Sequence, residues 1–242
     1  MNKTLVTIAT YNEIENLPLL VDAIHEQVPA TDILVIDDNS PDGTGDWVDR
    51  KGAEDDRIHC VHREGKLGLG TATIAAMRYA IEHGYDCMLN MDADFSHHPR
   101  YLPAMIAGMN EGEDDVCDCM IGSRYVAGGG TEGWPLHRRL MSRGVNLYAR
   151  VMLGLRPKDC SGAFRNYRVS VLEEIDFDSI RSRGYSFQEE ILWHLKRAGA
   201  RFDETPIVFA DRERGQSKIN SREAVAALWI LFRLGVKNWI GL

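Results

Sequence analysis

Three short apolar runs near the N-terminus constrain the fold of this 242-residue chain more than any other feature. They occupy residues 5–9, 33–36 and 87–91, and their length and composition are typical of parallel strands buried on both faces. Apolar residues at helical spacing over 16–28 and 71–83 predict a helix between each strand and the next. This β-α-β-α-β order indicates an α/β protein with a doubly wound sheet.

Polar segments follow all three predicted strands. Tyr11 and Glu13 follow the first strand, DDNSPDGT at 37–44 follows the second, and DAD at 92–94 follows the third. Each segment alone could be a helix cap or an ordinary turn. Because ligands of such sheets bind at the carboxyl ends of the strands, three segments at equivalent positions favour a binding site.

The length and cysteine pattern limit the protein class. A chain of this size fits one domain, since single cores stop growing at roughly 250–300 residues. Its five cysteines lack zinc-type spacing, which favours a reduced, cytoplasmic compartment. The start of the chain does not have the pattern of a secretory signal, and the longest apolar stretch, 224–232, is shorter than the ~20 residues of a membrane span. We therefore expect no segment that crosses a bilayer.

Charge is distributed unevenly along the chain. Residues 1–119 contain 8 Lys and Arg against 23 Asp and Glu, whereas 120–242 contain 20 against 13, so the two parts carry −15 and +7. An acidic part can hold a cation and a basic part can hold phosphates. Solvated charged surfaces are the alternative explanation.

A glycine-rich segment, GKLGLGTA at 65–72, has neither the spacing of a phosphate-binding P-loop nor the context of a dinucleotide fingerprint. We interpret it as close packing at the start of a helix, with Lys66 near a bound nucleotide.

The order of the motifs resembles that of a known family. TYNEIENLP, VIDDNSPDGTGD, KLGLGTA, MDADFSHHP, IGSRY, RRLMSRG, DCSGAFR, GYSFQEE and DRERGQSK occur in this order within residues 4–218. The chain thus resembles the family 2 glycosyltransferases, and among them the dolichyl-phosphate (polyprenyl-monophosphate) mannose synthases without transmembrane segments of their own. The resemblance implies a single-domain, Rossmann-like glycosyltransferase-A fold at 1–223, followed by a C-terminal amphipathic helix at 224–242.

The implied activity is transfer of mannose from GDP-mannose to a dolichyl or polyprenyl phosphate, with Mg²⁺ or Mn²⁺ as cofactor. The acceptor phosphate is already ionised at neutral pH, so a dedicated general base is unnecessary. Direct attack by that phosphate would invert the anomeric centre and give a β-linked product. Such an enzyme would work peripherally on the cytoplasmic face of a membrane, with no nucleic-acid partner.

The resemblance also assigns residues to the donor. Asp94 is implied as the primary metal ligand, with Asp92 and Ser96 beside it, although some relatives have Gln at the position of Ser96, a stronger ligand than Ser. Tyr11 can stack on a base while Glu13 accepts hydrogen bonds from it. The implied nucleotide pocket comprises Ala9, Tyr11, Glu13, Ile36, Asp38, Asp92 and Ala93. Ala9 stands where the family usually has Pro.

Basic residues are assigned to the phosphates, because Arg binds phosphate oxygens in pairs. The resemblance implies that Arg124 lies near both phosphate groups, that Arg212 and Lys218 hold the donor diphosphate, and that Arg138 and Ser142 hold the acceptor phosphate. Arg139 and Arg143 are adjacent candidates, and a basic helix face is the alternative. Gln188 and Glu189 are interpreted as orienting the sugar hydroxyls. Asp159 and Arg165 either fix the acceptor loop or form a structural ion pair. The implied catalytic set is Asp94, Arg124, Gln188 and Arg212.

The C-terminal segment has apolar residues at helical spacing. Trp229, Phe232, Trp239 and Ile240 add apolar bulk, and Arg233 and Lys237 can meet anionic lipids. This pattern predicts a helix that lies on a membrane or docks on a small membrane anchor subunit. Packing into the core is the alternative.

Three other functions are compatible with parts of the pattern. A UDP-sugar could replace GDP-mannose, which would make the protein a glucosyl- or N-acetylglucosaminyltransferase. A glycosidase would use paired carboxylates without a metal or phosphate-binding arginines. A lipid-phosphate carrier would bind the acceptor without turnover.

Overall fold

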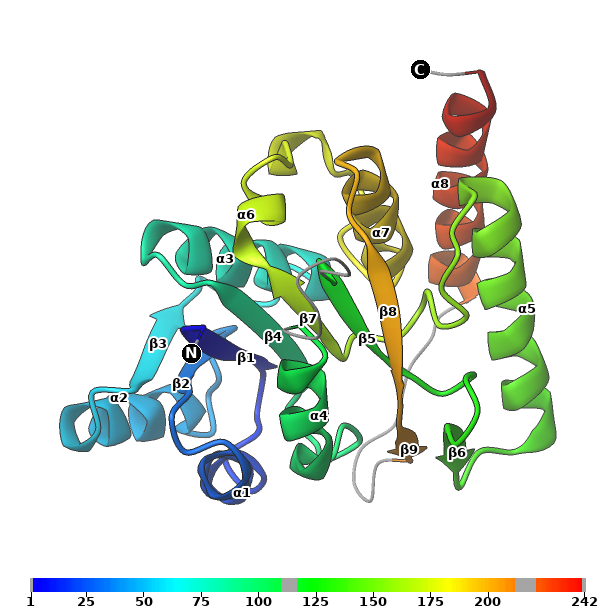
Figure 1. Ribbon diagram of the computed structural model, residues 1–242. Coiled ribbons are helices and arrows are strands. Elements are labelled where there is room, and N and C mark those ends of the chain that lie inside the picture. Colours follow the sequence, from blue (N-terminus) through cyan, green and yellow to red (C-terminus); the bar gives the residue numbers. More distant parts are fainter. Residues whose placement is uncertain (1, 110–116, 212–220, 241–242) are drawn as a thin grey trace.

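The computed structural model describes residues 2–109, 117–211 and 221–240, and is built around a seven-stranded sheet (Figure 1). The strand order across the sheet is β3-β2-β1-β4-β7-β5-β8. The strands are β1 (Thr4–Thr10), β2 (Asp32–Asp37), β3 (Ile58–His62), β4 (Cys87–Asp92), β5 (Cys119–Ser123), β7 (Arg165–Arg168) and β8 (Phe202–Pro206). The first four strands pair in parallel, and β7 is antiparallel to both of its neighbours.

Helices cover both faces of the sheet. One layer contains α1 (Leu17–Gln27), α2 (Thr44–Glu54) and α4 (Leu102–Ala107), and the other contains α3 (Leu69–Glu82), α6 (Val169–Leu172) and α7 (Phe187–Arg197). Alternate residues of β1 enter opposite layers: Leu5 packs with α3 and α7, whereas Val6 and Ile8 pack with α1. The predicted α/β class is confirmed.

The sequence interpretation missed two elements. It placed one helix between the second and third apolar runs, but α2 and β3 come there before α3. The reason is that β3 is an edge strand: its sequence is IHCVH and only Ile58 is buried, so it has no apolar run to detect. The glycine-rich segment packs closely, as expected. A Cβ at Gly70 would lie 2.8 Å from the Cβ of Phe187.

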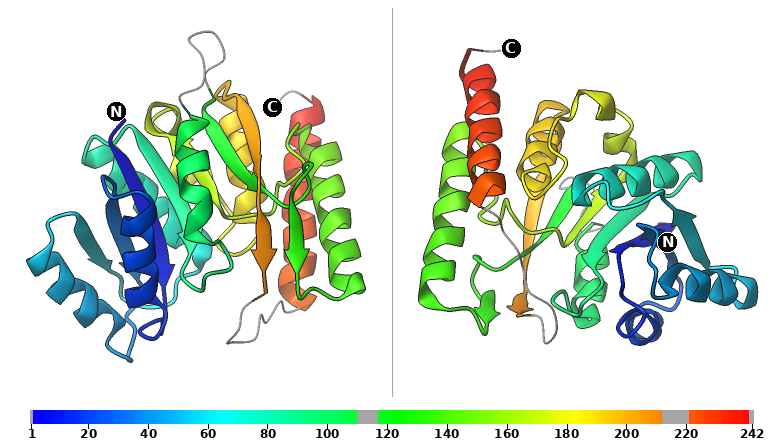
Figure 2. Two further views of the ribbon diagram at one scale, coloured as in Figure 1. Left: turned by 60° about the horizontal axis from the view of Figure 1, so that its bottom comes forward. Right: turned by 180° about the vertical axis from the view of Figure 1, so that it is seen from behind.

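Beyond the sheet lies a pair of long helices, α5 (Leu136–Leu153) and α8 (Ser221–Ile240), which run side by side (Figures 1 and 2). Gly235 permits the close approach, because a Cβ there would lie 2.5 Å from Cε of Met152. Leu231 and Leu234 of α8 are buried, but Trp229, Phe232 and Trp239 are exposed. Core packing therefore describes the buried face of the helix, and the membrane or partner role stays a prediction for its exposed face.

A short two-stranded sheet of β6 (Gly130–Glu132) and β9 (Val208–Ala210) lies near the N-terminal end of α5 (Figure 1). Two 3₁₀ turns, η1 (Pro99–Tyr101) and η2 (Phe177–Ser179), complete the elements. In the part of the chain that the structure describes, no helix is long and apolar enough to span a bilayer.

Candidate active site

The loops that follow β1 and β2 are joined to each other by hydrogen bonds. The Asn12 amide donates to Oγ of Ser40 at 3.0 Å, and the Glu13 amide donates to Oγ1 of Thr44 at 3.1 Å. Oγ of Ser40 in turn donates to Oδ1 of Asp37 at 2.6 Å. The two loops thus form one rim at the carboxyl ends of the strands, as the sequence predicts for a parallel sheet.

Two basic side chains lie beside residues of the predicted nucleotide pocket. Nζ of Lys66 lies 3.9 Å from the ring centroid of Tyr11, so it covers one face of the ring on which a base could stack. Nε of Arg63 lies 3.0 Å from Oδ1 of Asp38. Burial raises the pKa of Asp38 above its ordinary value, and the charge of Arg63 opposes this shift. The sequence interpretation had not identified Arg63.

Two further pocket candidates differ in exposure. Ala9 is half-buried, whereas Ile36 lies in the core. Since the Ile36 side chain packs between the sheet and its helices, only its backbone is available to a ligand.

The acidic motif lies where β4 ends. The Ser96 amide and hydroxyl both donate to Oδ1 of Asp94, at 3.1 and 2.6 Å. Phe95 between them has a φ of 60°, the left-handed conformation that makes this tight turn possible. Ser96 therefore orients the Asp94 carboxylate. The half-exposed carboxylates of Asp92 and Asp94 supply the hard oxygen ligands that Mg²⁺ and Mn²⁺ prefer, so the residues fit such an ion.

The buried side chain of His97 contacts this motif, and the sequence interpretation did not identify it. Its Nδ1 accepts a hydrogen bond from the Asp92 amide at 3.1 Å, and its ring stacks on Phe164 with centroids 5.0 Å apart. Burial lowers the pKa of His97, which keeps the ring neutral with its proton on Nε2. Its place in the sequence, immediately after the acidic motif, was the available signal.

Arg124, at the end of β5, forms a buried ion pair with Asp159. Its Nε and Nη2 donate to the two carboxylate oxygens at 2.7 and 2.6 Å. Burial alone would raise the pKa of Asp159, but the Arg124 guanidinium holds it below its ordinary value. The structural ion pair considered between Asp159 and Arg165 is wrong. Arg165 instead donates to the backbone carbonyls of Gln188 and Cys160, at 2.7 and 2.6 Å.

The two candidates for the acceptor phosphate already have side-chain partners. Nη1 of Arg138 lies 2.9 Å from both carboxylate oxygens of Asp211, and the guanidinium lies 4.1 Å above the ring of Trp134. The Ser142 hydroxyl accepts a hydrogen bond from the Tyr125 hydroxyl at 2.7 Å. Binding of a phosphate by Arg138 would therefore compete with Asp211.

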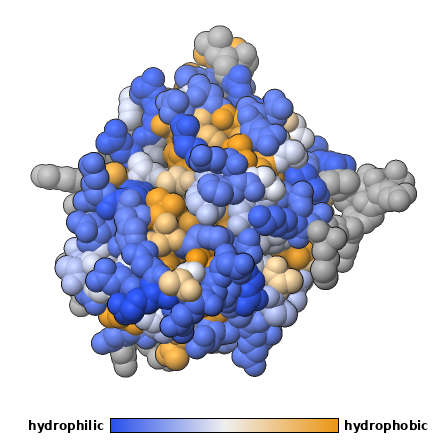
Figure 3. Space-filling view, turned by 90° about the vertical axis from the view of Figure 1, so that its left-hand side faces the viewer, coloured by the Kyte–Doolittle hydropathy of each residue, from blue (hydrophilic) through white to orange (hydrophobic). Residues whose placement is uncertain are grey.

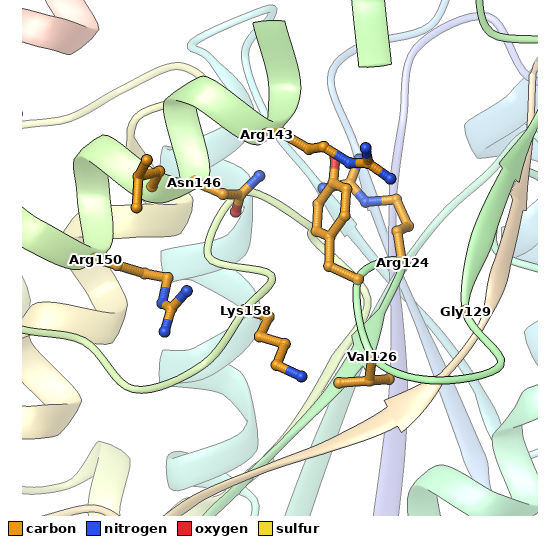
Figure 4. A pocket seen from close by; sticks show the side chains of 9 residues that line it. Arg124, Val126, Gly129, Arg143, Asn146, Arg150 and Lys158 are labelled. Carbon is orange, nitrogen blue, oxygen red and sulfur yellow. The ribbon is translucent and has the colours of Figure 1, made fainter. Parts of the chain in front are cut away.

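A basic cavity of about 410 Å³ lies between α5 and the segment that follows β5. Figure 4 shows Arg124, Arg143, Arg150 and Lys158 around it. Arg143 and Arg150 are seven residues apart on α5, two helical turns, and so lie on the same helix face. Arg143 was an adjacent sequence candidate, whereas Arg150 and Lys158 were missed.

The first turn of α7 buries the side chains of Gln188, Glu189 and Glu190. Both side-chain polar atoms of Gln188 and Oε2 of Glu189 have no hydrogen-bond partner within the described residues. Burial raises the pKa of the Glu189 carboxyl to about 7. Unpaired buried groups cost roughly 1–3 kcal/mol each, so their retention is consistent with a ligand that they contact. Two further sequence candidates, Arg212 and Lys218, lie outside the described residues.

These features define a class of protein. A mostly parallel sheet whose strand ends present an Asp-Ala-Asp motif beside a basic region has the architecture of a glycosyltransferase-A enzyme, which binds a nucleotide-diphosphate sugar. Sequence comparison agrees. The profile of glycosyl transferase family 2 matches residues 5–176, and the chain belongs to this family.

Two relatives match almost the entire chain. The undecaprenyl-phosphate mannosyltransferase of Micrococcus luteus is 44% identical over 241 residues, which cover 99% of this chain and 97% of the relative. The polyprenol monophosphomannose synthase of Mycolicibacterium smegmatis is 41% identical over 237 residues, covering 98% and 88%.

The fold also matches solved structures. Glucosyl-3-phosphoglycerate synthase from Mycobacterium tuberculosis, in complex with phosphoglyceric acid, superposes with a TM-score of 0.68 at 19% identity, covering 96% of this chain and 81% of that one. The complex of the same enzyme with Mn²⁺, UDP and glucosyl-3-phosphoglycerate gives a TM-score of 0.66 at 18% identity, covering 100% and 81%. At this identity the likeness concerns the fold, and it confirms the predicted glycosyltransferase-A architecture.

Proposed function

We propose that the protein transfers mannose from GDP-mannose to a polyprenyl or dolichyl phosphate, with inversion, giving the β-linked lipid-phosphate mannose and GDP. The observation that carries the proposal is the pairing of an acidic strand-end rim with a separate basic cavity on α5, which suits two phosphate-bearing substrates. The names of the two full-length relatives support both the sugar and the acceptor class.

On the donor side, Tyr11, Glu13 and Asp38 would contact the nucleotide. Asp94, with Asp92, would hold a divalent cation, which when bound neutralises the leaving diphosphate. Mn²⁺ accompanies UDP in the glucosyl-3-phosphoglycerate synthase complex, which supports the use of a divalent ion in this fold. The role of Ser96 is to orient Asp94 through the two hydrogen bonds described above.

On the acceptor side, basic residues would position an already ionised phosphate oxygen for attack. Arg138 and Ser142 are the candidates from the family resemblance, and Arg143, Arg150 and Lys158 surround the adjoining cavity. Gln188 and Glu189 would contact the sugar hydroxyls, which would satisfy their unpaired polar atoms.

A membrane surface is the proposed location of the acceptor. Exposed apolar side chains cover both helices of the pair: Leu136, Leu140, Met141, Leu147 and Val151 on α5, and Trp229, Phe232, Trp239 and Ile240 on α8. We call this set the α5/α8 apolar face. The side of the molecule at the left of Figure 1, drawn in Figure 3, is by contrast mostly hydrophilic. Exposed aromatic and aliphatic side chains on adjacent helices suit the headgroup boundary of a bilayer, here on its cytoplasmic face.

The decisive experiment is an incubation of pure protein with a short polyprenyl phosphate and GDP-mannose, with Mn²⁺, Mg²⁺ or EDTA. Mass spectrometry of the lipid should detect a hexosyl product only with a metal. A product formed only from UDP-glucose or UDP-N-acetylglucosamine would replace the donor assignment, and tight lipid binding without turnover would indicate a carrier.

A further inference from the structure

A second basic cavity, of about 250 Å³, lies between α7 and α8. Its walls include Arg181 and Arg197 on one side, Arg233 and Lys237 of α8 on the other, and the carboxylate of Glu190. None of these residues belongs to the donor rim or to the cavity on α5. We call it the α7/α8 cavity.

The lining of this cavity is mainly cationic. Arg181, Arg233 and Lys237 lie around one lining carboxylate, that of Glu190, which already accepts hydrogen bonds from the amides of Ser182 and Arg181, at 2.7 and 3.2 Å. His194, which also lines the cavity, adds no charge at neutral pH because burial lowers its pKa. Cations concentrated at one site repel each other, and a bound anion relieves this repulsion.

A polar group in the wall also lacks a partner. Trp193 is 5% exposed, and its indole Nε1 has no hydrogen-bond partner among the described residues. Cζ of Arg197 lies 4.9 Å from the centre of the Trp193 ring. An indole N–H and guanidinium groups are the donors that phosphate oxygens accept from.

The α7/α8 cavity adjoins the apolar stripe of α8. At 100° per residue, Arg233 and Lys237 lie on one side of α8, and the exposed side chains of Trp229, Val236 and Ile240 form the neighbouring stripe. If that stripe enters the headgroup boundary, the cavity lies at the level of the lipid phosphates.

We propose that the α7/α8 cavity binds the headgroup phosphate of an anionic phospholipid such as phosphatidylglycerol. The site would hold the enzyme on an anionic membrane at a fixed orientation, with the α5/α8 apolar face turned toward the lipid. This inference rests on the membrane docking proposed above, but it does not depend on which sugar is transferred.

The test compares Arg233→Gln/Lys237→Gln with a control of equal charge change, Arg50→Gln/Lys51→Gln on α2. Binding is measured by co-sedimentation with phosphatidylcholine vesicles that contain or lack phosphatidylglycerol. Each basic residue near an anionic surface contributes roughly a factor of five, so the cavity variant should bind anionic vesicles about thirtyfold more weakly, and the control should bind like the parent. Equal losses of vesicle binding in both variants would show that only the net charge of the protein matters, and would overturn the proposal.

Calorimetric titration with inorganic phosphate and with a short-chain phosphatidylglycerol distinguishes the sources of the phosphate. Both should bind the parent protein and lose affinity in the cavity variant. The lipid assignment is overturned if inorganic phosphate binds the parent protein, short-chain phosphatidylglycerol does not bind it, and phosphatidylglycerol in the vesicles does not strengthen vesicle binding. Arg181→Gln/Arg197→Gln, on the opposite wall, gives the same test should the first variant fail to fold.

Transfer to a short, water-soluble acceptor separates this inference from the proposed function. The cavity variant should retain the parent rate. Loss of that activity at an unchanged melting temperature would assign the cavity to the active site, against the proposal. Absence of transfer in the parent protein would instead contradict the proposed function and leave the vesicle result standing on its own.

Discussion

The proposed donor side and the proposed acceptor side of this protein are built in different ways. On the donor side, the rim consists of loops that directly follow β1, β2 and β4, and short-range contacts such as Ser96 to Asp94 hold them. On the acceptor side, the key groups come from distant parts of the chain: Arg138 meets Asp211 across 73 positions, and α5 meets α8. A sheet edge can thus prepare one substrate site locally, while the other site depends on how peripheral elements dock.

The largest effect is expected from removing the proposed metal ligand on the donor side. Asp94→Ala should lower transfer by at least about 10²-fold, because the diphosphate loses its metal-mediated neutralisation. The variant should still fold, since the residue lies partly exposed at a strand end, and the loss of the acceptor for the two Ser96 hydrogen bonds should lower the melting temperature only slightly. Steady-state rates and thermal unfolding check this, with Asp46→Ala on α2 as the control. Full turnover in folded Asp94→Ala would refute the metal site.

The next largest effect concerns the buried ion pair behind both sites. Asp159→Asn should destabilise the fold by about 3–5 kcal/mol, because it leaves the buried Arg124 guanidinium without its counter-charge. Asp178→Asn breaks an exposed pair with Arg78 and should cost less than about 1 kcal/mol. Urea unfolding of both variants measures the difference. Similar losses would mean that burial of the Arg124 pair is unimportant.

A third prediction uses the pKa of Glu189, which burial raises from 4.5 to about 7. Because the folded state holds this proton more tightly than the unfolded state, the free energy of unfolding should fall as pH rises between these values, by up to about 3 kcal/mol. The charged groups that act on Glu189 are Arg165, Asp159 and Arg124.

The matching variant is Glu189→Gln, which cannot ionise. It should be more stable than the parent at pH 8 and equally stable near pH 4.5, while transfer falls if Glu189 contacts the sugar. Unfolding at several pH values, with Glu64→Gln on the exposed surface as control, provides the measurement. A parallel pH dependence in parent and variant would contradict the assignment.

A smaller and more selective effect should sharpen the distinction between the two sides. Arg138→Ala should raise the KM for the lipid phosphate about tenfold and leave that for the donor nearly unchanged, since a charge-assisted hydrogen bond contributes roughly 1.5–3 kcal/mol. Separate Michaelis constants test this, and Arg50→Ala, at an exposed arginine of α2, is the control. A rise confined to the donor KM would place Arg138 on the other side.

The smallest effect is expected at the membrane face. Deleting the whole tail would discriminate poorly, because Leu231 and Leu234 belong to the core. Replacing the exposed Trp229, Phe232 and Trp239 by Ser should instead lower transfer to long-chain acceptor in vesicles about fivefold, with no change on a short soluble acceptor. Leu19→Ser, at an exposed leucine of α1, is the control. Equal loss of transfer to both acceptors would indicate that these side chains stabilise the fold and do not bind the membrane.

The parallel strands β1, β2 and β4 and the polar residues at their ends could be predicted from the sequence alone. These features depend on local patterns: an apolar run, a turn composition, a motif of three residues. The same locality allowed the glycine-rich segment to be interpreted as close packing, which the contact of Gly70 with Phe187 confirms. The edge strand β3 was not predicted, because a strand with one buried residue has no apolar run.

The contacts between distant groups could not be predicted in this way. Asp159 pairs with Arg124 and not with Arg165. The reason is that β7 inserts antiparallel between β4 and β5, which turns the Arg165 side chain toward backbone carbonyls. Arg150 and Lys158 form one cavity only after α5 docks beside the segment that follows β5. Such pairings depend on strand order and helix docking, which are set by the summed packing of the whole core, and no local stretch of sequence encodes that sum.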